Sequence, residues 1–479
     1  MSLDELHYRP LLDVSERIRR RELSPVTVLE AMLDRIARLD PTARSYTTVL
    51  ADRARAVAAR AEAEITAGMW RGPLHGIPLA VKDLCDTSFA PTTGGMPLRR
   101  NTTPDTDATV VRRLEDAGAV ILGKLKMTEG AYTSHHPDDP TPLNPWNAAH
   151  WVGSSSTGSG VATALGLCFG ALGSDTGGSI RFPSATCGLT GIKPTWGRVS
   201  RHGILPLAAS LDHIGPMTRN AADAAAILHA IVGADPNDPT ALPDPVPDYL
   251  KAVDQGIRGI TIGIDRGYNE GSIDPEVIEA TRAAEPVLAA LGARLREVRF
   301  PSTETLLRGW IPFCAVETAI AHQASYPSRA AEYGPDLANL IEHGRRMTAT
   351  EFGAILHERL AFSGQLAALF RDVDLLLMPT MPVPVPSLER MAEYGQDDSV
   401  LLRMLRFTAP FDFAGNPTIT LPSGIDAHGL PLSLQLVDRV CRRRCCAAPA
   451  TRSSNAPIGT RAGRRPDRRP GVRLSSAAG

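Results

Sequence analysis

The stretch from Gly153 to Gly188, which reads GSSSTGSGVATALGLCFGALGSDTGGSIRFPSATCG, constrains the fold more than any other part of the chain. A flexible Gly/Ser linker would stay polar throughout. This stretch is instead interrupted by VATALGLCFGALG (161–173), whose small apolar residues are typical of a tightly buried helix. The stretch is therefore predicted to lie inside a folded domain, and a linker is disfavoured.

A phosphate-binding loop is the second interpretation of the same stretch. A P-loop needs Gly-x4-Gly-Lys-Ser/Thr, because its lysine reaches the phosphates, and no lysine lies between Lys126 and Lys193. The dinucleotide fingerprint Gly-x-Gly-x-x-Gly follows a strand, and no strand pattern precedes Gly153. Nucleotide binding is therefore disfavoured as well.

The segment TGGS (176–179) supports a third interpretation, an active site with a serine nucleophile. Two glycines allow the backbone to turn so that consecutive N–H groups point at one spot. Such a nest of N–H groups can hold an oxyanion beside a serine that attacks a carbonyl carbon. The serine then needs a base, for which the local sequence offers two kinds of residue.

Four histidines in polar segments or loops keep a Ser-His-Asp triad open; they are His135, His136, His202 and His213. The alternative base lies in GIPLAVKD (76–83), which places Lys82 directly after an apolar strand. A lysine at a strand end is most often solvated. A desolvated lysine, however, can lose its proton near neutral pH and act as a base.

Together these segments resemble the amidase signature family of serine amidases. GIPLAVKD resembles its lysine motif, GSSSTGSGVA its glycine–serine motif, and GSDTGGSIRFPSATCGLTGIKPTWGRVS its nucleophile motif. GILPLAASLDHIGPMTRNAADAA and FTAPFDFAGNPTITLPSG also fit, so that the resemblance spans residues 5–437. It implies an α/β fold whose central mixed, twisted sheet is flanked by helices on both faces. It implies neither a cofactor nor a metal.

The resemblance also implies a Ser–cis-Ser–Lys triad. By motif the nucleophile is Ser179, the lysine is Lys82, and the bridging serine, 24 residues before the nucleophile, is Ser155. Ser154 and Ser156 are rival assignments for the bridging serine, because Ser154 stands where the family has a glycine. The Ser154–Ser155 peptide bond is expected to be cis. Lys82, held neutral, would take a proton from Ser179 through Ser155.

The remaining site residues follow from the same resemblance. The backbone N–H groups expected to hold the oxyanion are those of Thr176, Gly177, Gly178 and Ser179. Asp175 and Arg181 are expected to brace the nucleophile loop. Three residues are expected to contact the substrate, namely Met127, Ala131 and Ser154. Phe407, Phe411 and Phe413 are expected to line an aromatic pocket, which would suit aryl or alkyl amides.

The function implied is hydrolysis of C–N bonds in small amides through an acyl-enzyme on Ser179. Carbamates (urethanes) carry the same carbonyl beside nitrogen and are included, and esters are expected as a side activity. Two alternatives stay open. One is the A subunit of a glutamyl-tRNA amidotransferase, which needs partner subunits, and the other is a non-catalytic binding protein on the same fold.

Charge and composition exclude other classes. The net charge of −1 over 479 residues gives no reason to expect a nucleic-acid or membrane partner, and a homodimer stays open. The first residues lack the apolar region of a secretory signal. The scattered cysteines at 85, 168, 187 and 314 are typical of reduced, buried thiols in a cytoplasmic protein.

The end of the chain differs from the rest. Residues 441–479 carry ten arginines and one aspartate, a net charge of +9, which leaves −10 on residues 1–440. A basic binding arm, a disordered end and a reading frame that slipped near Asp438 are the three interpretations, and the composition favours the last. One catalytic domain is therefore predicted over residues 1–440, with a helical segment 1–70 packed on it.

Hydrophobic periodicity predicts the elements of that domain. Ser24 is a suitable N-cap for a helix that begins at Pro25. Apolar runs that alternate with helical segments predict strands and an α/β sheet. Loops are predicted over 233–260 and 382–400, which are rich in Pro and Asp. The predicted strands are 77–81, 119–123, 260–264, 374–378 and 432–437.

Overall fold

The computed structural model describes residues 6–394 and 398–440, so the arginine-rich segment 441–479 lies outside the described residues. One mixed sheet of 11 strands runs through it in the order β1-β3-β2-β4-β6-β5-β10-β11-β9-β7-β8. The runs β3-β2-β4 and β9-β7-β8 are parallel, and the other neighbours are antiparallel. The strands are β1 (Tyr46–Val49), β2 (Pro78–Lys82), β3 (Val120–Leu125), β4 (Gly170–Asp175), β5 (Thr190–Lys193), β6 (His213–Thr218), β7 (Thr261–Ile264), β8 (Arg294–Glu297), β9 (Leu375–Pro379), β10 (Thr418–Ile425) and β11 (Pro431–Asp438).

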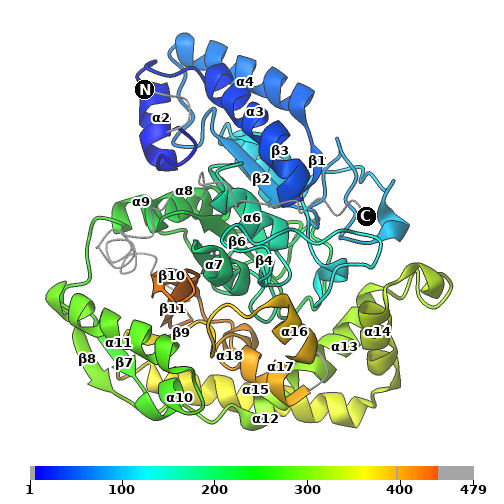
Figure 1. The fold of residues 1–479 in the computed structure, drawn as a ribbon, viewed down its shortest axis with the longest axis vertical. Coiled ribbons are helices and arrows are strands. Elements are labelled where there is room, and N and C mark those ends of the chain that lie inside the picture. Colours follow the sequence, from blue (N-terminus) through cyan, green and yellow to red (C-terminus); the bar gives the residue numbers. More distant parts are fainter. Residues whose placement is uncertain (1–5, 395–397, 441–479) are drawn as a thin grey trace, which may run out of the picture.

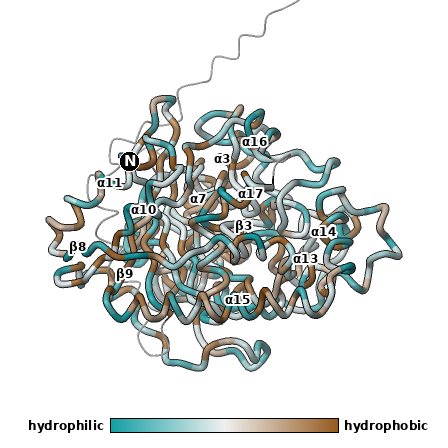
Figure 2. Tube along the Cα trace, turned by 90° about the horizontal axis from the view of Figure 1, so that it is seen from below, coloured by the Kyte–Doolittle hydropathy of each residue, from teal (hydrophilic) through white to brown (hydrophobic). Residues whose placement is uncertain are grey.

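Helices cover both faces of this sheet, which confirms the predicted architecture. The alternation of side chains along β9 shows it, because Leu375 and Leu377 belong to one hydrophobic cluster and Leu376 and Met378 to another. Figure 1 shows α3 and α4 with β1 and β3 at one end of the molecule, and β7, β8 and α11 at the other. In Figure 2, hydrophobic and hydrophilic stretches alternate along α15 at one surface.

The helices fill the connections between strands. The α-helices are α2 (Leu11–Arg19), α3 (Pro25–Ala43), α4 (Ala51–Thr66), α5 (Thr109–Asp116), α6 (Thr157–Ala164), α7 (Arg181–Cys187), α8 (Ala221–Ile231), α9 (Tyr249–Ala252), α10 (Arg266–Glu270), α11 (Pro275–Ala290), α12 (Glu304–Arg308), α13 (Trp310–Ala321), α14 (Pro335–Arg346), α15 (Ala349–Leu369), α16 (Leu388–Tyr394), α17 (Asp398–Leu405) and α18 (Ala409–Phe413). Short 3-10 helices lie at Pro97–Arg99, Glu129–Ala131 and Ala330–Glu332. None of the helices described here is long and apolar enough to cross a membrane.

All five predicted strands are present as β2, β3, β7, β9 and β11. Ser24 caps α3, because its side chain accepts hydrogen bonds from the N–H groups of Val26 and Thr27. Other expectations were wrong. The segment 1–70 contains β1 among its helices, the supposed loops hold α9, α16 and part of α17, and residues 161–173 are not one helix.

Residues 161–173 divide between the end of α6 and the strand β4 because the space around β4 admits only small residues. A Cβ atom on Gly170 would lie 2.6 Å from the Ile227 side chain of α8. On Gly173 it would lie 2.9 Å from the Ser156 hydroxyl and equally close to Met217 of β6. Close packing on both sides therefore selects glycine in this strand. The β-branched residues that usually indicate a strand in a sequence are excluded from these positions.

Candidate active site

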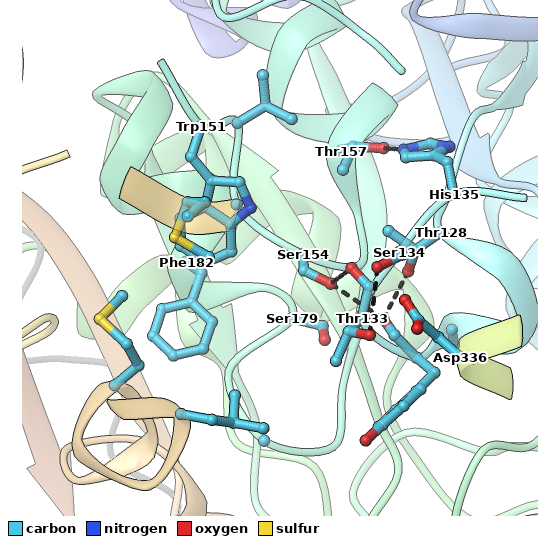
Figure 3. Close-up of a pocket in the computed structure, with 18 of the residues that line it drawn as sticks. Thr128, Thr133, Ser134, His135, Trp151, Ser154, Thr157, Ser179, Phe182 and Asp336 are labelled. Atoms are coloured by element: carbon cyan, nitrogen blue, oxygen red, sulfur yellow. Dashed lines mark hydrogen bonds between the residues drawn. The ribbon is translucent and has the colours of Figure 1, made fainter. Parts of the chain in front are cut away.

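A cavity of about 1070 Å³ opens beside the turn that follows β4 (Figure 3). Ser179 lines it and is partly exposed to it, together with Thr176 and Gly177. Figure 3 shows Trp151 and Phe182 on one side of Ser179, and Thr128, Ser134, His135 and Asp336 on the other. The lining also includes polar and apolar residues from other segments, namely Thr133, Asn339, Trp310, Leu388, Met391, Leu401, Leu402, Met404 and Leu405.

The turn that carries Ser179 needs both of its glycines. Gly178 has φ of +132°, and a Cβ atom there would lie 2.4 Å from the ring of Phe182. A Cβ atom on Gly177 would lie 2.4 Å from the indole of Trp310, whose Nε1 donates to the carbonyl of Thr176 at 3.1 Å. The backbone at 176–179 is therefore held tightly between two aromatic side chains.

Asp175 braces this turn from below, as expected. Its carboxylate accepts hydrogen bonds from the N–H groups of Gly178 at 2.6 Å and Ile180 at 3.0 Å, and from the Arg181 guanidinium at 2.8 and 3.0 Å. Arg181 also donates to Asp412 at 2.6 Å. Burial alone would raise the pKa of Asp175, but the adjacent Arg181 holds that pKa well below its ordinary value.

Lys82, the last residue of β2, is completely buried and lies among hydroxyl groups. Its Nζ is 2.6 Å from Ser155 Oγ, 2.7 Å from Ser174 Oγ and 3.0 Å from Ser156 Oγ. Desolvation lowers the pKa of Lys82 to about 7, a shift that Cys85, Asp175 and Asp212 partly oppose. The amine can therefore lose a proton near neutral pH, as a general base must.

The three serines before α6 have different hydrogen-bond partners. The Ser154–Ser155 peptide bond is cis, as expected. The Ser154 hydroxyl donates to the carbonyls of Tyr132 and Thr133, both at 3.0 Å, so it holds the cavity wall rather than Lys82 (Figure 3). Ser155 and Ser156 both reach Lys82, and Ser155 makes the shorter contact.

The expected oxyanion donors are not equivalent. The N–H of Gly178 is engaged by Asp175, as described above, and is directed at that carboxylate. Among the hydrogen bonds of the described residues, none uses the N–H of Gly177 or Ser179. Both residues line the cavity.

Two expectations about the substrate pocket were wrong. Met127 is buried and lines a separate cavity of about 130 Å³, whereas Ala131 and Ser154 do line the large cavity. Three phenylalanines expected to line the pocket lie instead inside a hydrophobic core, in a cluster that includes Phe313 of α13 and Phe362 of α15, and they do not line the cavity. They are Phe407, Phe411 and Phe413, with at most 1% of each exposed.

The histidines have other roles than a partner for Ser179. His135 lies at the cavity wall with its Nε2 3.1 Å from the hydroxyl of Thr157 (Figure 3), and His136 accepts from the N–H of Asp138. His213 is buried behind the turn, where its Nδ1 lies 3.2 Å from the carbonyl of Asp175. Among the described residues, no group of three or more His, Cys, Asp or Glu side chains could hold a metal ion.

Sequence reasoning missed the apolar wall and one contact of Lys82. Trp151, Phe182 and Trp310 come from three different segments, so no local pattern joins them. Ser174 could have been found, because it lies at the end of β4, and β4 is the parallel neighbour of the strand that ends at Lys82. Residues at the same ends of adjacent parallel strands lie close together.

Comparisons with known proteins agree with this geometry. The amidase family model matches residues 27–442. AmiD, a suggested amidase of Mycobacterium tuberculosis, is 48% identical over 437 residues, which is 91% of each chain. The A subunit of the glutamyl-tRNA(Gln) amidotransferase of Roseiflexus is 38% identical and covers 91% of this chain and 93% of its own. The peptide amidase of Stenotrophomonas maltophilia superimposes with a TM-score of 0.80 at 29% identity, over 96% of this chain and 98% of its own.

Proposed function

The chain belongs to the amidase signature family and is a hydrolase that acts on amides; within that family we propose that it is a stand-alone serine amidase of aryl or alkyl amides. The observation that carries the proposal is the buried Lys82, 2.6 Å from the hydroxyl of Ser155 and 2.7 Å from that of Ser174, which precedes the turn of Ser179. A desolvated amine beside a hydroxyl is suited to accept a proton, and a serine at the cavity wall is suited to attack.

The reaction begins with attack of Ser179 Oγ on the amide carbonyl carbon. The hydroxyl proton of Ser179 passes to Ser155, whose own proton passes to the lone pair of Lys82 Nζ. The C–N bond then breaks, and the leaving nitrogen takes a proton back through Ser155. Water then attacks the acyl-enzyme and gives a proton through Ser155 to Lys82. The bond from the acyl carbon to Ser179 Oγ breaks, and Ser179 takes a proton back through Ser155, which regenerates the hydroxyl.

The oxyanion of the tetrahedral intermediate is stabilised by backbone N–H groups. Gly177 and Ser179 are the donors we propose first, because both residues line the cavity and no hydrogen bond of the described residues uses their N–H groups, while that of Gly178 is occupied by Asp175. Thr176, the fourth donor expected by motif, also borders the cavity. Loss of one such donor costs about 3–4 kcal/mol of transition-state stabilisation.

The cavity supports an apolar acyl or leaving group. Trp151 and Phe182 lie with ring centroids 5.6 Å apart on one side of Ser179 (Figure 3), and the methionines and leucines of α16 and α17 extend this wall. An aryl or alkyl group therefore has a hydrophobic surface to contact. A carbamate presents the same carbonyl beside nitrogen, so we include urethanes among the substrates.

A glutamyl-tRNA amidotransferase subunit is the second candidate, favoured by the 38% identity to such a protein. Unlike a stand-alone amidase, such a subunit requires glutamine and partner subunits for its function. Turnover of simple amides by the isolated chain, without glutamine, ATP or tRNA, distinguishes the two.

The decisive experiment measures aniline release from an aryl amide and the matching aryl carbamate. Wild type is expected to cleave at least one of them and Ser179→Ala neither. Ser184→Ala, which removes a buried hydroxyl of α7 that has no hydrogen-bond partner among the described residues, is the matched control and should retain activity. Folded wild type that cleaves neither compound would contradict the proposal and direct attention to partner subunits. The ratio of the two rates distinguishes an amidase from a urethanase.

A further inference from the structure

Lys82 contacts two more hydroxyls than a proton relay from Ser179 needs. A relay uses Ser155 alone, yet Ser156 and Ser174 also lie within 3.0 Å of Lys82 Nζ. Both side chains are buried, and neither lines the cavity. They therefore have no contact with substrate, and any influence on the reaction must pass through Lys82.

The hydrogen-bond capacity of the amine shows what these hydroxyls do. A neutral lysine amine has two N–H donors and one lone pair, whereas the ammonium has three N–H donors. Three hydroxyls around Nζ match both forms. Two accept from the neutral amine while the third donates to its lone pair, and all three accept from the ammonium.

Ser156 is restricted to the accepting role. Its own hydrogen is directed at the carbonyl of Ser174, at 3.2 Å, and its oxygen also accepts the N–H of Ser174, at 3.2 Å. These two backbone bonds to β4 leave the hydroxyl one remaining lone pair, which faces Lys82. The absence of a side chain on Gly173 makes this approach feasible, because a Cβ atom there would lie 2.9 Å from Ser156 Oγ.

Ser174 and Ser155 then share the other N–H and the lone pair. Ser174 lies on β4, and Ser155 lies in the segment that reaches the nucleophile's turn, where the next residue, Ser156, donates its N–H to the carbonyl of Ser179 at 3.3 Å. Only the arrangement in which Ser174 accepts directs the lone pair of Nζ to Ser155. After proton transfer the ammonium donates to all three hydroxyls, so Ser174 and Ser156 also stabilise the charge that forms on Lys82.

We propose that Ser156 and Ser174 are positioning residues that occupy the two N–H groups of neutral Lys82, direct its lone pair to Ser155, and accept from the ammonium formed as Ser179 attacks. This inference rests on the proposed function, because it assumes that Lys82 is the base. The groups that act electrostatically on Lys82 are Cys85, Asp175 and Asp212, and they are unchanged by substitution of either serine.

A fluorophosphonate probe tests the inference without knowledge of the natural substrate. Ser179 Oγ forms a bond to phosphorus, fluoride leaves, and the serine proton passes through Ser155 to Lys82, so the labelling rate reports the same proton transfer. The full chain is labelled between pH 5 and 10, and the modified residue is identified by mass spectrometry.

Ser174→Ala is expected to be labelled about 10- to 100-fold more slowly at high pH, which is the effect of losing one hydrogen bond to a charged group. Its rate should also reach half of its plateau at a lower pH than wild type. The sign follows because the ammonium loses a stronger acceptor interaction than the neutral amine does, so the pKa of Lys82 falls. Ser156→Ala should behave in the same way.

Two controls distinguish positioning from mere structure. Ser174→Thr keeps the hydroxyl and should label within about threefold of wild type. Ser159→Ala removes a buried hydroxyl that also joins α6 to β4, through the carbonyl of Leu172 at 2.9 Å, without contact to Lys82. It should change neither the plateau nor the midpoint.

The labelling experiment distinguishes failure of the proposed function from failure of this inference. Wild type that is not labelled at Ser179 would refute the proposed function itself. Normal labelling of wild type, together with a Ser174→Ala protein that has the wild-type plateau and midpoint, would overturn only this inference. Equal losses in Ser174→Ala, Ser174→Thr and Ser159→Ala would also overturn it, because they would report a general effect on packing.

Discussion

Lys82 and Lys193 offer a comparison within one sheet. Each is the last residue of its strand, β2 or β5, and each is completely buried. Desolvation lowers the pKa of both to about 7. Burial and position in the sheet therefore do not distinguish them.

The hydrogen-bond partners of Lys82 and Lys193 distinguish the two residues. Lys82 meets three hydroxyls, which can donate as well as accept. Lys193 meets the carbonyls of Pro194 and Asn416 and the Nε2 of His213 at 3.1 Å. Since the Nδ1 of His213 faces the Asp175 carbonyl, which only accepts, Nδ1 carries the ring hydrogen and Nε2 accepts from Lys193.

These partners distinguish a lysine that can act as a base from one that has a structural role. Three acceptors match the three N–H groups of an ammonium, so the contacts of Lys193 favour its protonated form, and Asp412 and Asp175 oppose the lowering of its pKa by desolvation. The hydroxyls around Lys82 adapt to either protonation state. A buried lysine is thus suited to proton exchange when its neighbours can reverse their hydrogen bonds.

Replacement of Lys82 by methionine should have the largest effect on catalysis. We expect kcat/KM of Lys82→Met to fall by about 10⁴-fold, as for loss of a member of a nucleophilic triad. The free energy of unfolding should change little, because the three hydroxyls can pair with one another. Aniline release and urea denaturation measure the two quantities, and retention of a tenth of wild-type activity would contradict the assignment of Lys82 as the base.

Lys193→Met should have the opposite result, a large loss of stability and a small loss of activity. It leaves three buried acceptors without a donor and removes a positive charge beside Asp175, so the free energy of unfolding should fall by about 3 kcal/mol. For the folded protein, kcat/KM should change less than tenfold. If instead Lys193→Met unfolds like wild type but loses activity as Lys82→Met does, the distinction between the two lysines is wrong.

Gly177→Ala perturbs the oxyanion donors while leaving both lysines in place. The new methyl group would lie 2.4 Å from the Trp310 indole, so the turn must shift and kcat/KM should fall about 100-fold. The pH midpoint of the reaction should stay at its wild-type value, since the contacts of Lys82 are unchanged. A double variant with Trp310→Leu should recover part of the loss, and a moved midpoint would show that the turn and Lys82 are coupled.

The pH dependence of kcat/KM for wild type is the smallest expected effect, and it tests the protonation of Lys82 most directly. Because Lys82 must be neutral to accept a proton, and its pKa is about 7, kcat/KM should rise about tenfold per pH unit below that value and level off above it. Lys193→Met should keep this limb, measured over the pH range in which it stays folded. A bell-shaped or flat profile between pH 5 and 9 would argue against Lys82 as the titrating group.

Much of this arrangement could be predicted from the sequence, because the relevant signals are local. Apolar runs identified β2 and β9, and motif spacing led to Ser155, which the structure places beside Lys82. The strand β4 was missed, since close packing against neighbouring strands and helices selects glycine and serine there. The supporting contact of Ser174 depends on which strands are adjacent, and that is a property of the fold.

The cavity was harder to predict for the same physical reason. Met127 follows β3 and is close in sequence to Ala131, yet only Ala131 faces the large cavity. Phe407, Phe411 and Phe413 have the composition of an aromatic pocket, but they fill a core. Hydrophobic side chains are equally suited to a core and to a ligand wall, so composition cannot distinguish the two.

The origin of the apolar wall has a consequence for how the protein can change. The proposed reacting groups belong to β2, to the segment before α6 and to the turn after β4, whereas leucines and methionines that line the same cavity come from α16 and α17, far along the chain (Figure 1). Substitutions in those helices can reshape the room for an acyl group while the proton path stays intact. Selectivity and chemistry can therefore evolve, or be engineered, one at a time.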